Sequence, residues 1–238
     1  MNNTPKIILK REKDVGWLQI NNPPENYLEQ PDFIQLDILK EFVNSGIKVL
    51  VIEGAGRHFS AGADLKKLKE QIKDRKAFQD QLMRGNKLLN HIDELEIPAI
   101  AAITGVCFGA GLEIALACDI RICDENTLFA FPEVQYDLFP GLGGTKRLAE
   151  LTGLSAAIEL VLSGDMINAE KAMELQIVDQ LVEGKRALNY AVDLAHKITN
   201  NRPLKVIQAV MKSVNDSKNL SSNELIRNDT EMFIELAL

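Results

Sequence analysis

A glycine-rich turn followed by a single carboxylate is the stretch of this chain whose residue types best suit chemistry. An apolar, strand-like segment at Ala99 to Ile103 runs into a turn that contains three glycines, and a helix of small residues follows. The start of such a helix leaves backbone N–H groups unpaired, and these favour negative charge. Within the helix, Glu113 has glycine or apolar neighbours three and four positions away, so we expect its side chain to face the core. A buried carboxylate is costly unless it has a partner or a function.

Two simpler explanations of this stretch stay open from these residues alone. Gly109 and Gly111 form a Gly-x-Gly pair, but no third glycine stands in register for a dinucleotide-binding fingerprint, which disfavours a nucleotide cofactor. The other explanation is a structural glycine turn beside a core glutamate, because ion-pair networks also bury carboxylates. Features elsewhere in the chain weigh against both.

Two loops share one design, in which an apolar strand is followed by glycine and alanine at the start of a helix. The first runs from His58 to Leu65, and Asp64 within it is suited to cap the helix that follows. The second is Phe108 to Gly111, where Ala110 stands in the place that Ala63 has in the first loop. If the backbone N–H groups of these two alanines converged on one point, they would form an oxyanion hole, which stabilises a developing negative charge.

Composition limits the classes of protein to which the chain can belong. It has 238 residues, 46% of them hydrophobic and 26% charged, which suits one globular domain with or without a small appendage. The net charge of −7 disfavours nucleic acid as a main partner, since phosphate binding needs clustered Lys and Arg. No run reaches the roughly 18 apolar residues of a membrane span. Met1 to Lys10 also lacks the apolar core of a signal peptide.

The cysteines indicate neither a metal site nor a disulfide framework. None of them has metal-ligand spacing with the three histidines, so we expect small buried hydrophobic side chains at Cys107, Cys118 and Cys123 and no bound metal. An odd number of cysteines without a disulfide pattern suits a reducing compartment. We therefore expect a cytoplasmic location.

The order of the expected elements is that of an α/β domain followed by helices. Apolar or alternating segments predict strands at 6–10, 16–20, 49–53, 99–103, 120–123 and 128–130, with a short extended piece at 177–182. Amphipathic segments predict helices at 31–45, 66–94, 145–151, 155–162, 169–175, 185–199, 203–214 and 223–237. Loops are expected at 54–65 and 131–144. Strands and helices alternate early and helices dominate late, which indicates an α/β fold with a helical C-terminal region.

Several motifs, taken together, resemble the crotonase superfamily, also called the enoyl-CoA hydratase/isomerase superfamily. The resemblance extends over about residues 15–182. It is carried by Phe59 to Leu65, Pro98 to Ile103, Gly105 to Ile122, Phe131 to Glu133 with Pro140 to Leu148, and Leu162 to Glu170. Because several independent motifs occur in the superfamily's order, the chain is identified as a member.

The resemblance implies a fold and an assembly. It implies a crotonase-type ββα spiral core over residues 1–182 and a helical C-terminal trimerisation region over residues 183–238. Members are usually trimers or dimers of trimers, so we expect one of these two homo-oligomers.

The resemblance also implies an acyl-CoA thioester as the substrate. Its carbonyl oxygen would be held by the backbone N–H groups of Ala63 and Ala110. Coenzyme A would run along the segment that matches Ala61, Gly62, Asp64, Leu65 and Lys66. For Lys66 itself, a phosphate contact and a solvated helix face remain equally open.

Two glutamates match the catalytic pair of the superfamily's hydratases. Glu113 matches one and Glu133 the other, and Gly141 matches the position whose N–H helps to hold the attacking water. Taken alone, Glu133 after Pro132 could equally be a carboxylate at a helix start. Asp137 departs from the pattern, because the superfamily usually has glycine there. It would either add a third charge near the site or only change the turn.

These observations lead to one first hypothesis and several alternatives. The first is an enoyl-CoA hydratase, in which Glu113 accepts a proton from water attacking C3 and Glu133 protonates C2. No metal or redox cofactor is expected. Alternatives within the superfamily are double-bond isomerisation, decarboxylation, dehydration or carbon–carbon cleavage, on a thioester of coenzyme A or of an acyl carrier protein. An alternative of another class is a catalytically inactive binding protein with the same fold.

Overall fold

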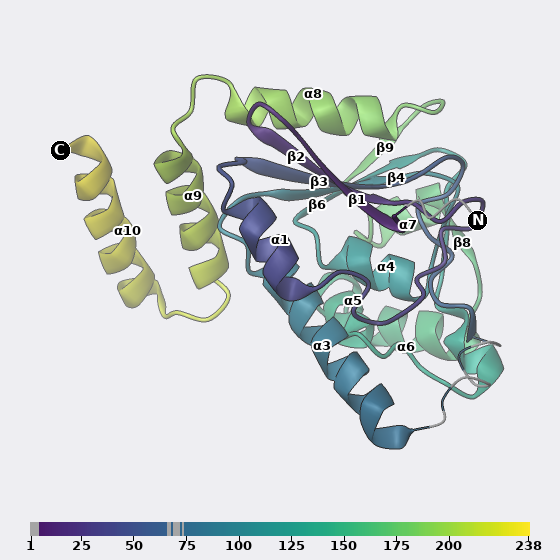
Figure 1. Cartoon of the computed structure of the whole chain (residues 1–238). Helices are drawn as coiled ribbons and strands as arrows, with labels where there is room; N and C mark the ends of the chain where they lie inside the picture. Colours follow the sequence, from purple (N-terminus) through teal and green to yellow (C-terminus); the bar gives the residue numbers. More distant parts are fainter. Residues whose placement is uncertain (1–4, 66–67, 69–71, 73) are drawn as a thin grey trace.

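A six-stranded sheet forms the centre of the molecule (Figure 1). The computed structural model describes residues 5–65, 68, 72 and 74–238. The strands follow the order β1 (Ile7–Glu12), β2 (Val15–Ile20), β3 (Val49–Gly54), β4 (Ala99–Ile103), β6 (Ile120–Asp124) and β9 (Gln180–Val182). β1 and β2 pair antiparallel, and each later pair is parallel. β4 is buried along its whole length, as expected for a parallel strand covered on both faces.

A second, smaller sheet carries the turn that precedes Glu113. It joins β5 (Val106–Phe108), β7 (Leu128–Ala130) and β8 (Ile167–Asn168). The sequence predicted only a glycine-rich turn where β5 lies, because its three residues stand between Gly105 and Gly109, and glycines usually mark turns. Gly105 and Gly109, with φ of 63° and 51°, turn the chain into and out of β5. β4, β5 and the helix that follows thus form one ββα unit.

Helices cover the large sheet on both faces (Figure 1). One face packs on α8 (Ala187–Thr199), whose small residues meet side chains such as Val49 and Val51. Leu50 and Ile52 alternate with these valines and point into the larger core on the opposite face. Around that core lie α1 (Leu36–Val43), α3 (Arg75–Asp93), α4 (Ala110–Leu116), the 3₁₀ helix η1 (Pro132–Tyr136), α5 (Gly144–Thr152), α6 (Leu154–Ser163) and α7 (Ala169–Glu174). This alternation of strands and helices confirms the predicted α/β class.

The last two helices form a hairpin that stands away from the sheet (Figure 1). α9 (Leu204–Asp216) contacts α10 (Ser222–Ala237), and none of the described side chains of α10 is buried. The helical C-terminal region is thereby confirmed. The division into domains at residues 182 and 183 stays a prediction, and α8, which follows that division, packs on the sheet.

Two predicted helices start more than two residues before the observed ones. The helix expected at 31–45 begins at Leu36, because the residues before it pack on α3, where a Cβ on Gly85 would lie 2.7 Å from the carbonyl oxygen of Pro31. The helix expected at 66–94 is not continuous. Asp74 is extended and caps α3 by accepting from the N–H groups of Lys76 and Ala77. Residues 66, 67, 69–71 and 73 of that prediction lie outside the described residues. The loop expected at 131–144 contains η1.

Candidate active site

α4 carries Glu113 into the interior of the protein. This short helix follows the glycine turn, and the Glu113 side chain is buried, with 1% of the residue exposed. The expectation that Glu113 faces the core is therefore confirmed. A Cβ on Gly111 would stand 2.6 Å from the carbonyl oxygen of Ser60, so glycine at this position lets α4 pack directly on the loop that contains Ala63.

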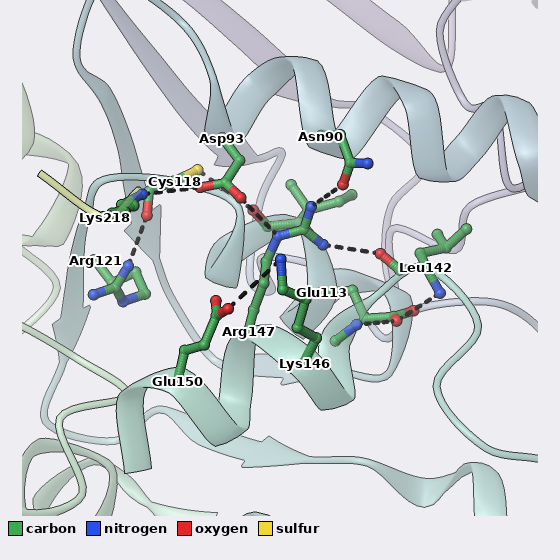
Figure 2. Close-up of polar contacts among 12 residues, drawn as sticks. Asn90, Asp93, Glu113, Cys118, Arg121, Leu142, Lys146, Arg147, Glu150 and Lys218 are labelled. Carbon is green, nitrogen blue, oxygen red and sulfur yellow. Dashed lines mark hydrogen bonds and ion pairs between the residues drawn. The ribbon is translucent and has the colours of Figure 1, made fainter. Parts of the chain in front are cut away.

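The Glu113 carboxylate is held by the backbone of the segment that leads into α5. Its Oε1 accepts hydrogen bonds from the N–H of Leu142 at 2.7 Å and from the N–H of Gly144 at 2.9 Å (Figure 2). Sequence reasoning singled out Gly141 in this segment but missed these two donors. The run Gly-Leu-Gly-Gly was the available signal, since glycines mark close backbone approach.

Glu133 is the second buried carboxyl group, and it lies on η1 beside the glycine turn. Only 6% of the residue is exposed. A Cβ on Gly109 would lie 2.7 Å from Oε1 of Glu133, so the carboxyl group sits directly against the residue that precedes Ala110. Its other oxygen, Oε2, is buried and has no hydrogen-bond partner in the described part of the chain. Such an orphaned oxygen is available to a bound molecule.

Both carboxyl groups bind protons more tightly than an exposed glutamate. Burial raises the pKa of Glu113 to about 7, while the N–H groups of Gly144 and Leu142 and the charge of Arg147 act in the opposite direction. Burial also raises the pKa of Glu133 to about 7, where its own backbone N–H opposes the rise and the Glu113 charge adds to it. The N–H donors and Arg147 thus favour the ionised form of Glu113, whereas the charge of Glu113 favours the neutral form of Glu133.

The two alanine loops lie against each other. The N–H of Ser60 donates to the carbonyl of Val106 at 3.2 Å, and the N–H of Phe108 donates to the carbonyl of Ser60 at 2.9 Å. Further along, a Cβ on Gly62 would stand 3.0 Å from the backbone nitrogen of Ala110. Neither Ala63 nor Ala110 donates its N–H to an acceptor within the described residues. The pairing therefore brings both candidate donors to one place with their N–H groups free.

A cavity of about 280 Å³ opens in front of these groups. Ala63, Ala110, Glu113, Glu133 and Gly141 all line it. The rest of the wall is largely apolar and includes Leu65, Leu68, Ile72, Phe78, Leu82 and Phe139. One cavity thus contacts both glutamates and both alanines, together with an apolar surface suited to a hydrocarbon chain.

A second cavity of about 520 Å³ adjoins the first and shares Leu28, Glu29, Ala63 and Leu68 with it. Asp64 lines this second cavity. The backbone nearby is fixed, because the N–H of Ala61 donates to Glu25 and the carbonyl of Gly62 accepts from Leu28. Ala63, Asp64 and Leu65 therefore line the groove that the two cavities form, while Ala61 and Gly62 line neither cavity. Lys66, predicted to contact coenzyme A, lies outside the described residues.

Asp137 ends η1 and does not line the cavity. It has φ of 55° and ψ of 34°, the left-handed conformation that glycine adopts most easily and that aspartate tolerates. The wall is formed by its neighbours Leu138 and Phe139. Of the two roles considered for Asp137, the structure therefore favours a change in the turn.

The cysteines match their expected structural role. Cys107, Cys118 and Cys123 are free thiols and all are buried. Among the described residues, no group of three or more His, Cys, Asp or Glu side chains is placed to hold a metal ion. No helix built from those residues is long and apolar enough to cross a membrane.

Comparisons with known proteins agree with the geometry of this site. The family model described as enoyl-CoA hydratase/isomerase matches residues 10–237. A short-chain-enoyl-CoA hydratase of Clostridium acetobutylicum is 37% identical over 206 residues, which cover 84% of this chain and 77% of that protein. A 2,3-dehydroadipyl-CoA hydratase of Escherichia coli K12 is 33% identical over 235 residues, or 98% of this chain and 90% of that protein. The solved structure of Pseudomonas aeruginosa DspI superposes with a TM-score of 0.88 at 30% identity. The match covers 99% of this chain and 90% of the DspI chain. The chain therefore belongs to the enoyl-CoA hydratase/isomerase family of the crotonase superfamily, and it is an enzyme of that family.

Proposed function

We propose that the protein is an enoyl-CoA hydratase that adds water across the C2–C3 double bond of a 2-enoyl-CoA thioester. The observation that carries the proposal is the pair of buried carboxyl groups, Glu113 and Glu133, on the wall of one cavity that also contacts Ala63 and Ala110. Hydration needs one group that accepts a proton and one that donates a proton. The names of the two curated relatives, both hydratases of CoA thioesters, support this reaction class.

The backbone N–H groups of Ala63 and Ala110 form the oxyanion hole in this proposal. As water attacks C3, negative charge develops on the thioester oxygen, and the two free N–H groups stabilise it. One such donor is worth about 3 kcal/mol in other oxyanion holes. Because these donors and two carboxyl groups supply the stabilisation and the proton transfers, the reaction needs no metal and no redox cofactor.

Glu113 is the base and Glu133 the acid. The ionised Glu113, which accepts from Leu142 and Gly144, takes a proton from the attacking water, whose oxygen bonds to C3. The N–H of Gly141, on the same wall, helps to hold that water. The protonated Glu133 delivers its proton to C2. One turn leaves Glu113 protonated and Glu133 ionised, and proton exchange with water restores both.

The groove that continues from the site accommodates the rest of the substrate. Coenzyme A lies along Ala61, Gly62, Asp64 and Leu65 toward Lys66, and the apolar wall takes the acyl chain. The proposal also includes a homotrimer or a dimer of trimers in the cytoplasm. Large apolar side chains that stay exposed in a single chain support an assembly, among them Leu154, Ile158, Leu162, Val210, Val214 and Phe233.

A spectroscopic assay tests the function directly. Purified protein is mixed with crotonyl-CoA and with longer 2-enoyl-CoA thioesters, and loss of the enoyl-thioester absorbance is followed. The matching 3-enoyl-CoA and 2-enoyl acyl-carrier-protein thioesters are assayed in parallel, and the Glu113→Gln, Glu133→Gln double variant is the control. We expect rapid hydration of a 2-enoyl-CoA by the wild type alone. Preferred turnover of the 3-enoyl or carrier-protein thioester, or no turnover at all, would overturn the proposal.

A further inference from the structure

Arg147 lies directly behind the segment that holds Glu113. Its side chain projects from α5 into the core, and 6% of that side chain is exposed. Nη1 donates to the carbonyl of Leu142 at 3.0 Å, and Nη2 donates to Oδ1 of Asn90 at 2.7 Å (Figure 2). Nε lies 3.4 Å from Oδ2 of Asp93. Each nitrogen of the guanidinium therefore has a partner, and the group is fixed in one orientation.

Leu142 connects this guanidinium to the candidate base. Its carbonyl accepts from Arg147, while its N–H donates to Oε1 of Glu113 at 2.7 Å. A Cβ on Gly143 would lie 2.9 Å from Nη1 of Arg147, so glycine lets the guanidinium approach the backbone closely. A movement of Arg147 would therefore be transmitted to the donors of Glu113.

We propose that Arg147 is a positioning residue for the reaction. Its guanidinium fixes the 142–144 backbone in the geometry that orients the Glu113 carboxylate, and its charge favours the ionised form of that carboxylate. Arg147 does not line the cavity, so it acts through Glu113 rather than on the substrate. The inference rests on the proposed function, in which Glu113 is the base.

The charges around Glu113 and Arg147 have the signs that the positioning role of Arg147 requires. Glu113 faces Glu133 on η1 and Arg147 on α5, and the Arg147 charge lowers the pKa of Glu113 against the larger effect of burial. Asp93 at the end of α3 contacts Arg147 at 3.4 Å and Lys218 at 3.7 Å, so it is itself paired with a second cation.

Cys118 interacts electrostatically with Arg147, and two further titratable groups lie on the same helix as Arg147. Cys118 follows α4, and burial raises the pKa of its thiol, so that it stays neutral near neutral pH. Lys146 and Glu150 on α5 are exposed and pair with each other at 3.5 Å (Figure 2). The groups that shift the pKa of Glu113 include Arg147 but not Cys118, Lys146 or Glu150.

A purely structural role is the alternative, and Arg121 offers a matched control for it. The Arg121 side chain is also 6% exposed and also pairs with a carboxylate, that of Asp179, at 2.8 Å. It donates to the carbonyls of Cys118 and Ile177, as Arg147 donates to that of Leu142. Its contacts reach the segment before β9 and the turn after α4, and none of them involves the Glu113 carboxylate, Leu142 or Gly144. Loss of either arginine removes a buried guanidinium, but only loss of Arg147 should alter Glu113.

The first experiment measures Glu113 without any substrate. Carbon-13 NMR of protein labelled at the glutamate carboxyl carbon follows its titration, with the Glu113 signal assigned through Glu113→Gln. We expect Arg147→Gln to raise the midpoint by about one pH unit, since a nearby guanidinium typically lowers a carboxyl pKa by about 1 to 3 units. Arg121→Gln should leave it unchanged. An unmoved midpoint in folded Arg147→Gln, or equal shifts in both variants, would overturn the inference even if the wild type proved not to be a hydratase.

The second experiment measures turnover in Arg147→Lys and Arg121→Lys. These milder changes keep the inference testable if Arg147→Gln does not fold. Arg147→Lys keeps the charge but cannot reach all three partners, so we expect kcat for 2-enoyl-CoA hydration to fall about 10- to 100-fold with little change in KM. Arg121→Lys should retain wild-type kcat. In Arg147→Gln the acid limb of the kcat/KM profile should also move to higher pH, because Glu113 must be ionised to act. Unchanged kcat in Arg147→Lys would contradict the positioning role.

Discussion

Gly144 approaches Glu113 so closely that a Cβ built on it would stand 2.6 Å from Cγ and 2.9 Å from Oε1 of the glutamate. Its N–H also donates to Oε1 at 2.9 Å. Gly144 is the first residue of α5, so the position needs glycine for space and not for an unusual backbone conformation. The contact makes Glu113 sensitive to a single methyl group.

Gly144→Ala should therefore impair catalysis while the protein stays folded. The added methyl group overlaps the Glu113 side chain, which must turn away from Leu142 and from the cavity. A displacement of about 1 Å can cost about 100-fold in rate, so we expect kcat to fall by that order. Lys146→Ala, an exposed change on the same helix, is the control, and melting curves check the fold. Wild-type kcat in Gly144→Ala would show that this contact does not position Glu113.

The proton affinity of Glu133 should appear in the pH dependence of stability. Burial raises its pKa to about 7 from the ordinary value of 4.5, so between these values the folded protein binds a proton that the unfolded chain has released. The free energy of unfolding should therefore fall as pH rises through that window. Glu133→Gln removes this contribution to the pH dependence. The free energy of unfolding of the variant relative to that of the wild type should therefore rise by about 1 to 3 kcal/mol from about pH 5 to pH 8.

Urea unfolding at several pH values measures this effect. Glu224→Gln is the control, because the exposed Glu224 accepts hydrogen bonds from Ser221, which lower its pKa. Removal of the Glu224 carboxylate should not raise the free energy of unfolding at high pH in the same way. A constant difference between Glu133→Gln and the wild type across the window would mean that Glu133 has an ordinary proton affinity.

The oxyanion assignment can be tested by proline at the first position of a helix, where proline is common. Ala110 is the first residue of α4, and proline suits this helix position, where it removes the N–H. We expect Ala110→Pro to lower kcat for 2-enoyl-CoA hydration by about 10²- to 10³-fold. Ser222→Pro places proline at the first position of the exposed helix α10 and serves as the control. A folded Ala110→Pro protein with near-normal turnover would remove Ala110 from the oxyanion hole.

The sequence was sufficient for the features that depend on local pattern. The helical spacing around Glu113 predicted its burial. The shared design of the two loops pointed to Ala63 and Ala110, which line one cavity, and their role as donors stays a prediction. The strands at 49–53 and 99–103 were predicted within a residue of β3 and β4, since long apolar runs give a strong signal.

Features that depend on contacts between distant segments could not be predicted. The donors Leu142 and Gly144 lie 29 and 31 positions from Glu113, and Arg147 reaches Asp93 across 54 positions. The 141–144 run has four backbone N–H groups, and only the three-dimensional path of the chain decides that those of Leu142 and Gly144 reach the carboxylate. The helix expected from Pro31 failed for the same reason, because a tertiary contact with Gly85 overrides local propensity.

The assembly state should depend on the exposed apolar face of α10. In a single chain, 73% of Phe233 and 64% of Ile226 are exposed, although these side chains are large and apolar. We expect light scattering to give the mass of a trimer or of a dimer of trimers at micromolar concentration. Phe233→Glu should shift the mass toward the monomer, because burying a carboxylate in an apolar interface is costly. Glu235→Ala on the same helix is the control. A monomer mass for the wild type would contradict the expected assembly.

The two glutamates distinguish a hydratase from its relatives, because hydration uses both and isomerisation can run on one. Glu113→Gln removes the base that takes the proton from water, and Glu133→Gln removes the acid that protonates C2. Each change should lower kcat for 2-enoyl-CoA hydration by about 10²- to 10⁴-fold, the usual range for general acid or base catalysis. The losses should not multiply in the double variant, because the two residues act as a unit.

An isomerase would show a different pattern in the same measurements. One glutamate would then be nearly dispensable, and a 3-enoyl-CoA would be the better substrate, since a single carboxylate can remove a proton and return it. The matched changes Glu53→Gln and Glu170→Gln lie outside the cavity and control for the loss of a negative charge. If Glu113→Gln hydrates every 2-enoyl-CoA as fast as the wild type, Glu113 is not the base, and the orientation of its carboxylate by Leu142 and Gly144 must serve the structure alone.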